Sequence, residues 1–183
     1  MRNLHPEIKR IIIDEQRIQE RVCEIAEQID QDYADVERIY LIGILKGAFI
    51  FTADLTRKIQ VPHLVDFMSI SSYGDRAVAN GAVRLILDVR KPIKGEHVII
   101  LEDIVDTGNT MSYLYKTLKG RAPASLKTCT LFRKKREAKN VPLDYVGFEI
   151  PDVWVVGYGL DYADRHRTLP YIAELKREVY QEG

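Results

Sequence analysis

Apolar runs alternate with segments of helical periodicity along most of this chain, a pattern typical of an α/β fold. Residues 38–45 and the apolar run that ends at Leu101 indicate strands buried on both faces, and residues 47–59 indicate the helix after the first of them. Further strands are predicted at 10–14, 63–71, 83–89 and 125–134. The alternation predicts a mostly parallel, twisted sheet flanked by helices, which binds its ligands at the carboxyl ends of its strands.

The segment after Asp14 predicts an amphipathic helix. Asp14 is a good N-terminal cap, and apolar side chains recur behind it at spacings of three and four residues. These side chains are Ile18, Val22, Ile25, Ala26 and Ile29. We expect this face to pack on the sheet.

The pattern becomes irregular after residue 134, with short strand-like pieces, several Pro and Gly, and no long helix. We interpret residues 1–183 as a single domain with a core at about 35–134. The N-terminal segment and residues from about 135 to 183 would form a small added lobe, or hood.

Charge and cysteine content narrow the classes of function. The 27 basic and 27 acidic residues cancel, so no global field favours a nucleic acid or an anionic membrane, and any anion site must be local. Cys23 and Cys129 are isolated in apolar patterns, as expected for reduced thiols. The first residues lack a signal-like apolar stretch, and the best apolar run is interrupted by Lys46. We therefore expect a cytoplasmic protein that contacts neither membrane nor nucleic acid.

The segment VIILEDIVDTGNTM, residues 98–111, carries the most informative chemistry. A Gly/Thr turn that opens a helix attracts phosphate through its amides and hydroxyl groups. The carboxylates of Glu102 and Asp103, at the strand end, can accept hydrogen bonds from sugar hydroxyls and from the water shell of a metal ion. A sugar phosphate satisfies both halves. The alternative is an acidic strand end in which Asp106 merely caps the helix.

This segment resembles the phosphoribosyl-pyrophosphate (PRPP) signature of type I phosphoribosyltransferases. The resemblance extends over nearly the whole chain, and LKGAFIF, SSYGD and VGFEIPDVWVVGYGLDY narrow it to the members that act on hypoxanthine and guanine. It implies the type I phosphoribosyltransferase fold with a purine-binding hood, and transfer of a 5-phosphoribosyl group from PRPP to a 6-oxopurine in purine salvage. The residues that would bind the ribose phosphate are Glu102, Asp103, Ile104, Val105, Asp106, Thr107, Gly108, Asn109 and Thr110.

The resemblance also assigns residues that would otherwise be read as solvated surface. Lys46 and Gly47 would bind pyrophosphate together with Arg167, in a loop that often has a cis peptide at Leu45-Lys46. Ser72 and Tyr73 would belong to a lid.

Magnesium is the implied cofactor. Asp161 would contact Mg²⁺, as would Glu102 and Asp103 from the segment 102–110, which we call the acidic turn.

The purine site is implied in the C-terminal third. A lysine would donate to the purine O6 and oppose the 6-amino group of adenine. Counting forward from the strand start gives Lys134, whereas counting back from residue 140 leaves Lys135 open. Trp154, in a predicted short strand, would stack on the base in place of the usual Phe or Tyr, and the backbone of Val155 would read the edge of the base.

Asp106 is our candidate general base, because a carboxylate there could accept the proton on the imidazole ring of the purine. The family resemblance further implies a homodimer or homotetramer.

Two other classes of protein share parts of the pattern. RNA-binding attenuation proteins share the fold and signature, although zero net charge argues against them, and a phosphohydrolase would need a downstream acid and lysine set that we do not find.

Overall fold

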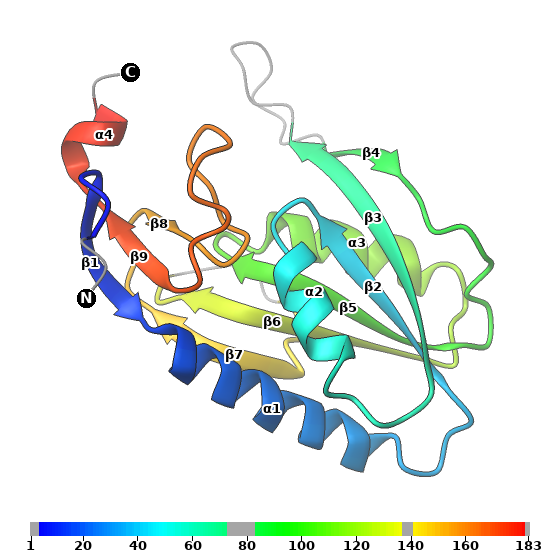
Figure 1. The fold of residues 1–183 in the computed structure, drawn as a ribbon. Coiled ribbons are helices and arrows are strands. Elements are labelled where there is room, and N and C mark those ends of the chain that lie inside the picture. Colours follow the sequence, from blue (N-terminus) through cyan, green and yellow to red (C-terminus); the bar gives the residue numbers. More distant parts are fainter. Residues whose placement is uncertain (1–3, 73–82, 137–140, 182–183) are drawn as a thin grey trace.

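Residues 4–72, 83–136 and 141–181, which the computed structural model describes, form two β-sheets with four helices (Figure 1). In these ranges the larger sheet has the order β4-β3-β2-β5-β6-β7 and the smaller β1-β9-β8. The strands are β1 (Ile8–Ile13), β2 (Ile39–Leu45), β3 (His63–Ser72), β4 (Val83–Leu87), β5 (His97–Val105), β6 (Ser125–Lys134), β7 (Tyr145–Ile150), β8 (Val155–Val156) and β9 (Ile172–Leu175). The helices are α1 (Glu15–Asp32), α2 (Phe49–Thr56), α3 (Asn109–Lys119) and α4 (Arg177–Gln181). Neighbours in the larger sheet are parallel except β3 and β4, which confirms the predicted fold class.

Helices cover both faces of the larger sheet, which explains the near-continuous apolar runs. In β2, Ile39 and Leu41 pack with side chains of α1 and α2, whereas Tyr40 and Ile42 pack with α3. Successive side chains of a strand point to opposite faces, so both faces need apolar residues. The core therefore fixes the direction of β2 and β5, whose carboxyl ends carry Lys46 and the acidic turn.

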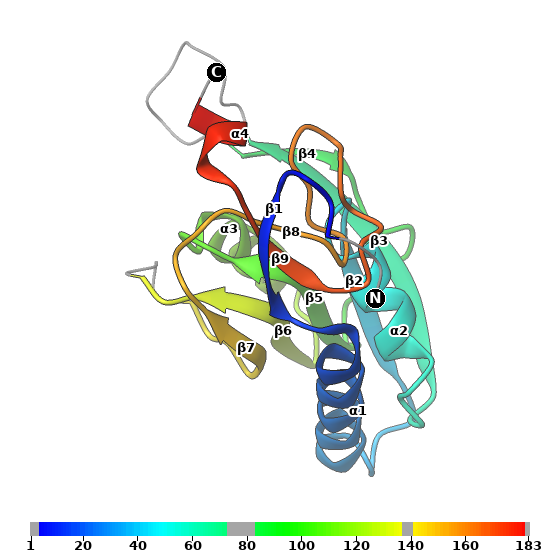
Figure 2. The same cartoon turned by 60° about the vertical axis from the view of Figure 1, so that its left-hand side comes forward.

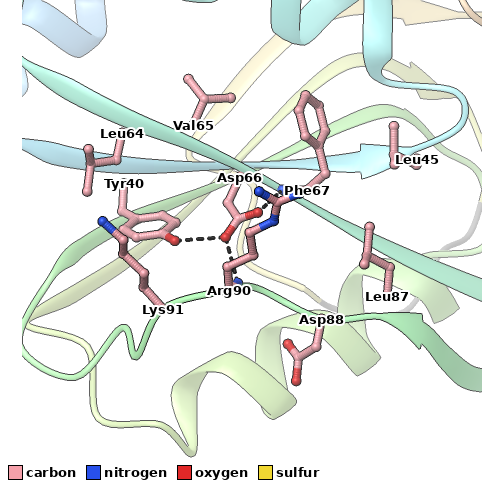
Figure 3. Close-up of a pocket in the computed structure, with 10 residues that line it drawn as sticks. All are labelled: Tyr40, Leu45, Leu64, Val65, Asp66, Phe67, Leu87, Asp88, Arg90 and Lys91. Atoms are coloured by element: carbon pink, nitrogen blue, oxygen red, sulfur yellow. Dashed lines mark hydrogen bonds between the residues drawn. The ribbon is translucent and has the colours of Figure 1, made fainter.

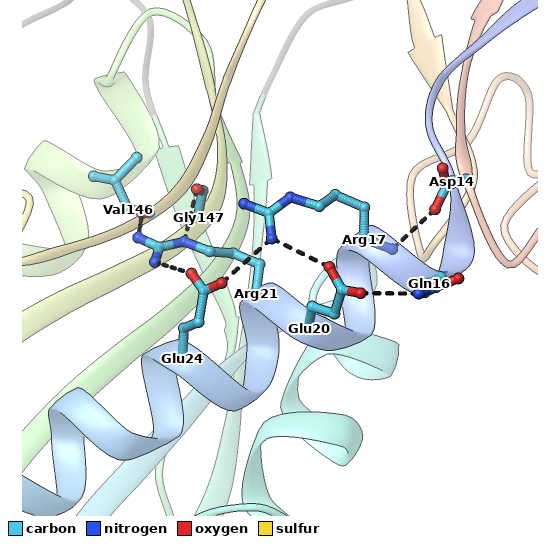
Figure 4. Close-up of polar contacts among 8 residues, drawn as sticks. All are labelled: Asp14, Gln16, Arg17, Glu20, Arg21, Glu24, Val146 and Gly147. Atoms are coloured by element: carbon cyan, nitrogen blue, oxygen red, sulfur yellow. Dashed lines mark hydrogen bonds and ion pairs between the residues drawn. The ribbon is translucent and has the colours of Figure 1, made fainter.

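Helix α1 begins as predicted, with the Asp14 carboxylate accepting a hydrogen bond from the amide of Arg17 at 2.9 Å. The five predicted apolar side chains are all buried. On its outer side, Figure 4 shows Arg21 reaching β7, where it donates to the carbonyls of Val146 (2.7 Å) and Gly147 (2.9 Å). These bonds occupy carbonyls on β7, which ends the larger sheet, and fix α1 beside it.

The smaller sheet joins the two ends of the chain and forms the hood. Strand β9 pairs antiparallel with both β1 and β8, and Figure 2 shows β1 and β9 running side by side. The Glu174 carboxylate of β9 binds Lys9 at 2.7 Å and Arg10 at 2.8 Å on β1. In Figure 1 the hood lies at the carboxyl ends of β5 and β6, where ligands of parallel sheets bind.

Two local expectations differ from the structure, and a third is not tested by it. Helix α2 is shorter than the predicted 47–59, because Lys46 and Gly47 form a turn closed by hydrogen bonds from Ala48 to Ile44 and from Phe49 to Lys46. Trp154 precedes the two-residue strand β8 instead of lying within it. Of the predicted lid residues, Ser72 ends β3, and Tyr73 lies outside the described residues.

The helices of the described ranges include none that is both long and apolar enough to cross a membrane.

Candidate active site

The acidic turn forms a cavity of about 250 Å³ between the end of β5 and the start of α3. Its lining runs without interruption from Glu102 to Met111, so it includes every residue expected to bind the ribose phosphate. Carboxylates stand at one end of this cavity and the start of a helix at the other. The sequence placed these groups together because they are contiguous in the chain.

Gly108, and not Asp106, occupies the N-cap of α3. Gly108 has φ 74°, in the left-handed region that glycine adopts without a steric penalty, and no side chain caps the helix. The alternative interpretation of Asp106 as a helix cap is therefore wrong. The first amides of α3 have no partners within the helix itself, and together with Thr107 and Thr110 they are suited to bind an anion.

Glu102 and Asp103 bring two carboxylates into the protein interior at the end of β5. Their exposed fractions are 6% and 7%, and Glu102 Oε2 has no hydrogen-bond partner among the residues that the structure describes. Burial raises the pKa of Glu102 well above its ordinary value, and the adjacent Asp103 raises it further. Burial also raises the pKa of Asp103, although the amide of Ile104 donates to its Oδ1 at 2.8 Å. Such a pair is suited to a bound cation or to hydroxyl donors.

This carboxylate pair predicts an unusual pH dependence of stability in buffer that contains a chelator. Because the folded state raises the pKa of Glu102, its contribution to the free energy of unfolding is present below the unfolded pKa and is lost as pH rises through the folded pKa. Glu102→Gln should remove that loss and raise the melting temperature at neutral pH, by about 2–4 °C for each kcal/mol of repulsion removed. Thermal unfolding of both proteins across the pH range measures the effect.

Glu96→Gln is the matched control. Arg38 lowers the pKa of Glu96, so its replacement should leave the melting temperature unchanged or lower it. A Glu102→Gln protein that melts below the wild type at neutral pH would contradict the argument.

Two of the expected pyrophosphate-binding residues, Lys46 and Arg167, meet at one carboxylate. Lys46 Nζ and Arg167 Nη2 both contact Asp164 Oδ1, at 3.0 Å and 2.9 Å, and Arg167 also pairs with Asp161 Oδ1 at 2.9 Å. The Leu45-Lys46 peptide is cis, as the resemblance implied. Asp164 was not among the predicted site residues; its position three residues before Arg167 was the available signal. Asp164, 118 residues after Lys46, thus brings the two cations together from distant parts of the chain.

Gly47 packs directly against the acidic turn and the hood. A Cβ on Gly47 would lie 1.7 Å from Asp103 Oδ2, and a Cβ on Gly159 would lie 1.9 Å from the carbonyl oxygen of Gly47. Gly159 also has φ 103°, a conformation that favours glycine. Three segments therefore meet here with no room for another side chain.

Lys134 reaches the cavity from the end of β6. Its Nζ lies 3.1 Å from Asp106 Oδ2 and 3.4 Å from Asp152 Oδ1, and only 13% of its side chain is exposed. Lys135, the alternative from the sequence, is exposed. Arg136 Nη1 lies 2.8 Å from Asp106 Oδ1, an ion pair without hydrogen-bond alignment. Arg136 and Asp152 were not predicted from the sequence. The basic cluster 133–136 gave no indication of which of its side chains contact Asp106, and nothing in the sequence connected Asp152 to Lys134.

Trp154 lies at the hood and is 45% exposed, so it is not a core residue. Its ring stacks on Tyr180 with centroids 5.3 Å apart and meets Tyr162 edge-on at 5.5 Å. Val155 follows in β8, with its side chain buried. Asp152, two residues before Trp154, connects this segment to Lys134.

A second cavity, of about 440 Å³, lies beside β3 and β4 and is larger than the acidic one (Figure 3). Its half-buried acid, Asp66, accepts hydrogen bonds from Tyr40 Oη at 2.9 Å and from the amides of Phe67 (2.8 Å) and Arg90 (2.7 Å). These bonds occupy both carboxylate oxygens of Asp66, and Arg121 binds both oxygens of Asp88, the other acid of this lining. The acids that line this cavity therefore already have partners. The acidic turn is therefore the better candidate site despite its smaller volume.

Comparisons with known proteins find similar chains over most of the length of this one. The model of the phosphoribosyl transferase domain matches residues 11–163. The chain is 47% identical to the hypoxanthine-guanine phosphoribosyltransferase of Dictyostelium discoideum, over 95% of this chain and 99% of that protein. It is 46% identical to the hypoxanthine phosphoribosyltransferase of Salmonella typhimurium, over 90% and 94%.

The structural comparison extends over a similar length. The Trypanosoma cruzi hypoxanthine phosphoribosyltransferase, solved in complex with the product IMP, has a TM-score of 0.91 to this chain and 42% sequence identity. The match covers 97% of this chain and all of that one. The match therefore extends over almost all of the six-stranded sheet and the hood of this chain.

Proposed function

The chain belongs to the phosphoribosyltransferase family, and from that premise we propose that it transfers the 5-phosphoribosyl group of PRPP to a 6-oxopurine. The products are IMP from hypoxanthine, GMP from guanine, and pyrophosphate, so the reaction is a step of purine salvage. One observation carries the proposal. The cavity at residues 102–111 joins buried carboxylates to a helix start, and the ammonium group of Lys134 faces it through Asp106.

The acidic turn would bind the ribose phosphate. The amides at the start of α3, with Thr107 and Thr110, are placed to enclose the 5′-phosphate. Glu102 and Asp103 would accept hydrogen bonds from the ribose hydroxyls, which explains why an unpartnered carboxylate oxygen is kept in the interior.

The same carboxylates fit a divalent cation, because a cation nearby would offset the cost of burying two negative charges. Glu102 and Asp103 would hold Mg²⁺ from the acidic turn, and Asp161 from the hood. Bound Mg²⁺ supplies charge neutralisation for pyrophosphate.

Lys46, Gly47 and Arg167 would hold the pyrophosphate group. Lys46 and Arg167 already converge on one carboxylate oxygen of Asp164, which marks a position where their cations can share an anion. Gly47 brings the loop backbone directly against the carboxylate of Asp103, since no side chain intervenes. Ser72 and Tyr73 would close over this region as a lid that excludes water.

The purine would lie between Lys134 and the hood. Lys134 would donate a hydrogen bond to O6, Trp154 would stack on the ring, and the backbone of Val155 would read its edge. Asp106, 3.1 Å from Lys134, is placed to accept the proton on the imidazole ring as N9 attacks C1′ of the ribose. The transition state is oxocarbenium-like, so catalysis depends on positioning and on charge stabilisation.

We further propose that the protein acts in the cytoplasm as a homodimer or homotetramer. A solved structure of Trypanosoma cruzi hypoxanthine phosphoribosyltransferase, with a TM-score of 0.92 and 42% identity to this chain, concerns the role of the C-terminal region in the oligomeric state of that protein.

A panel of purines incubated with PRPP and Mg²⁺ tests the proposed reaction. Hypoxanthine and guanine should give nucleotides, whereas adenine should react at least about 100-fold more slowly, because its 6-amino group opposes the Lys134 ammonium group. Nucleotide formation is followed by chromatography for each base. A preference for adenine would contradict the assignment of Lys134, and phosphate release from simple phosphoesters without PRPP would contradict the reaction.

A further inference from the structure

Two histidines and a glutamate of the hood meet outside the residues assigned to the reaction. His5 and Glu7 precede β1, and His166 comes from the loop between β8 and β9. One ligand atom of each lies within 4.8 Å of the other two. From this geometry we propose that His5, Glu7 and His166 form a binding site for a transition-metal ion of the Zn²⁺ class.

The donor set suits Zn²⁺ better than Mg²⁺. Imidazole nitrogen and carboxylate oxygen are common zinc ligands, and two histidines with one glutamate form a known three-ligand set that leaves a position for water. Magnesium prefers oxygen ligands throughout. This site and the Mg²⁺ site of the reaction would therefore select different ions.

The three groups are held close to the required geometry. His166 Nε2 lies 2.5 Å from Glu7 Oε2, and the rings of His5 and His166 meet edge-on with centroids 4.8 Å apart. Zinc ligands in a tetrahedral site lie about 3.3 Å apart, so a zinc ion requires a shift of about 1 Å between them. The exposed His5 side chain has room for that movement.

Neighbouring contacts orient these ligands. Arg165 Nη1 binds Glu7 Oε1 at 2.7 Å, which leaves Oε2 facing His166. The amide of Ile8 donates to the carbonyl of His5, and that of Lys176 donates to the carbonyl of Glu7, both at 2.9 Å. Such outer contacts fix the orientation of metal ligands. The guanidinium group of Arg165 repels a cation bound nearby, so we expect the affinity of the site for Zn²⁺ to be moderate.

An ion at this site would connect the N-terminal segment to the loop that carries Asp161 and Arg167. His166 is the immediate neighbour of Arg167, whose guanidinium group binds the carbonyl of Gly159 at 2.8 Å. Metal binding at His166 would thus restrain this loop from outside the active site. The inference rests on the cluster alone and does not depend on the proposed reaction.

Chelator competition with ZnCl₂ on the metal-stripped full chain tests the site. We expect one Zn²⁺ bound per chain in excess Mg²⁺. Binding should be at least about tenfold weaker for His5→Gln, Glu7→Gln and His166→Gln, since even the loss of a residue that only orients a metal ligand reduces metal affinity about 10- to 100-fold. His63→Gln is the matched control. His63 lies at the start of β3, hydrogen-bonded to the carbonyl of Val61, and its loss should leave binding unchanged.

Two further measurements keep the test independent of folding defects and of activity. In NMR spectra of wild-type histidine rings, Zn²⁺ should shift the signals of His5 and His166 but not those of His63 and His97. Zn²⁺ should also raise the melting temperature of the wild type and of His63→Gln, but not that of His166→Gln. Unchanged binding in His5→Gln and His166→Gln, or binding lost only in Cys23→Ser, would overturn the proposal.

Discussion

Replacing Asp106 with asparagine should lower kcat for IMP formation by about 10²–10³-fold, within the range that general base catalysis contributes. Asparagine preserves the size of the side chain but cannot accept the proton that leaves the purine. It still lines the cavity at residues 102–111, so IMP affinity should change by less than about threefold, since the lost basicity matters mainly in the transition state. Steady-state kinetics with hypoxanthine and PRPP, together with IMP titration, measure both quantities.

Asp152→Asn is the matched control for this experiment. Asp152 contacts the same two cations as Asp106, with Lys134 at 3.4 Å and Arg136 at 3.4 Å, but it does not line the cavity. Its replacement disturbs the same charge network without removing the proposed base, so kcat should fall by less than about tenfold. Equal losses in the two variants would mean that Asp106 acts only through its ion pairs. Near-normal turnover in Asp106→Asn would remove Asp106 from the role of base.

The sequence was most informative where the chemistry is contiguous. The turn from Glu102 to Thr110 could be recognised because a buried strand, three acids and a glycine-threonine turn follow each other directly. The strand at 125–134 was likewise predicted with its observed bounds. In both segments local preference and tertiary packing favour the same conformation, which is where reading a single sequence succeeds.

Contacts between distant segments were harder to predict. Asp164 meets Lys46 across 118 positions, and Asp152 meets Lys134 only because β7 returns the chain to the sheet edge. Charge patterns do not reveal such pairs, since a charged residue that forms an ion pair and one that does not look alike in sequence. Trp154 shows the related difficulty at an element boundary. The sequence predicted a short strand that includes Trp154, yet the register with β9 begins at Val155.

The choice between Asp106 and Gly108 as the start of α3 shows how backbone geometry decides chemistry. Asp106 was the only cap considered from the sequence, although glycine can also occupy that position. The left-handed conformation at Gly108 places the helix start two residues later and leaves the Asp106 carboxylate free to meet Lys134. A single backbone conformation thus turns a possible cap into a candidate base.

Gly47→Ala should have the second large effect, a loss of at least about 100-fold in kcat/KM for PRPP, because misplacement by about 1 Å can cost that much. The new methyl group would lie 1.7 Å from Asp103 Oδ2 and 2.5 Å from its Cγ. Asp103 cannot retreat easily, since it is buried and its Oδ1 already accepts from the amide of Ile104. The loop must therefore move, and Gly159 packs against its other side so closely that a Cβ there would lie 1.9 Å from the carbonyl oxygen of Gly47.

Gly120→Ala provides the control, because it adds the same methyl group where the nearest atoms are 3.6 Å away and φ is −63°. It should preserve kcat/KM and leave stability unchanged or slightly higher, since alanine restricts the unfolded chain more than glycine. Circular dichroism of both variants should show an intact fold, because the six-stranded core does not depend on the loop at residue 47. A Gly47→Ala enzyme with wild-type kcat/KM would show that this loop adapts to a side chain, and the pyrophosphate site would then need another location.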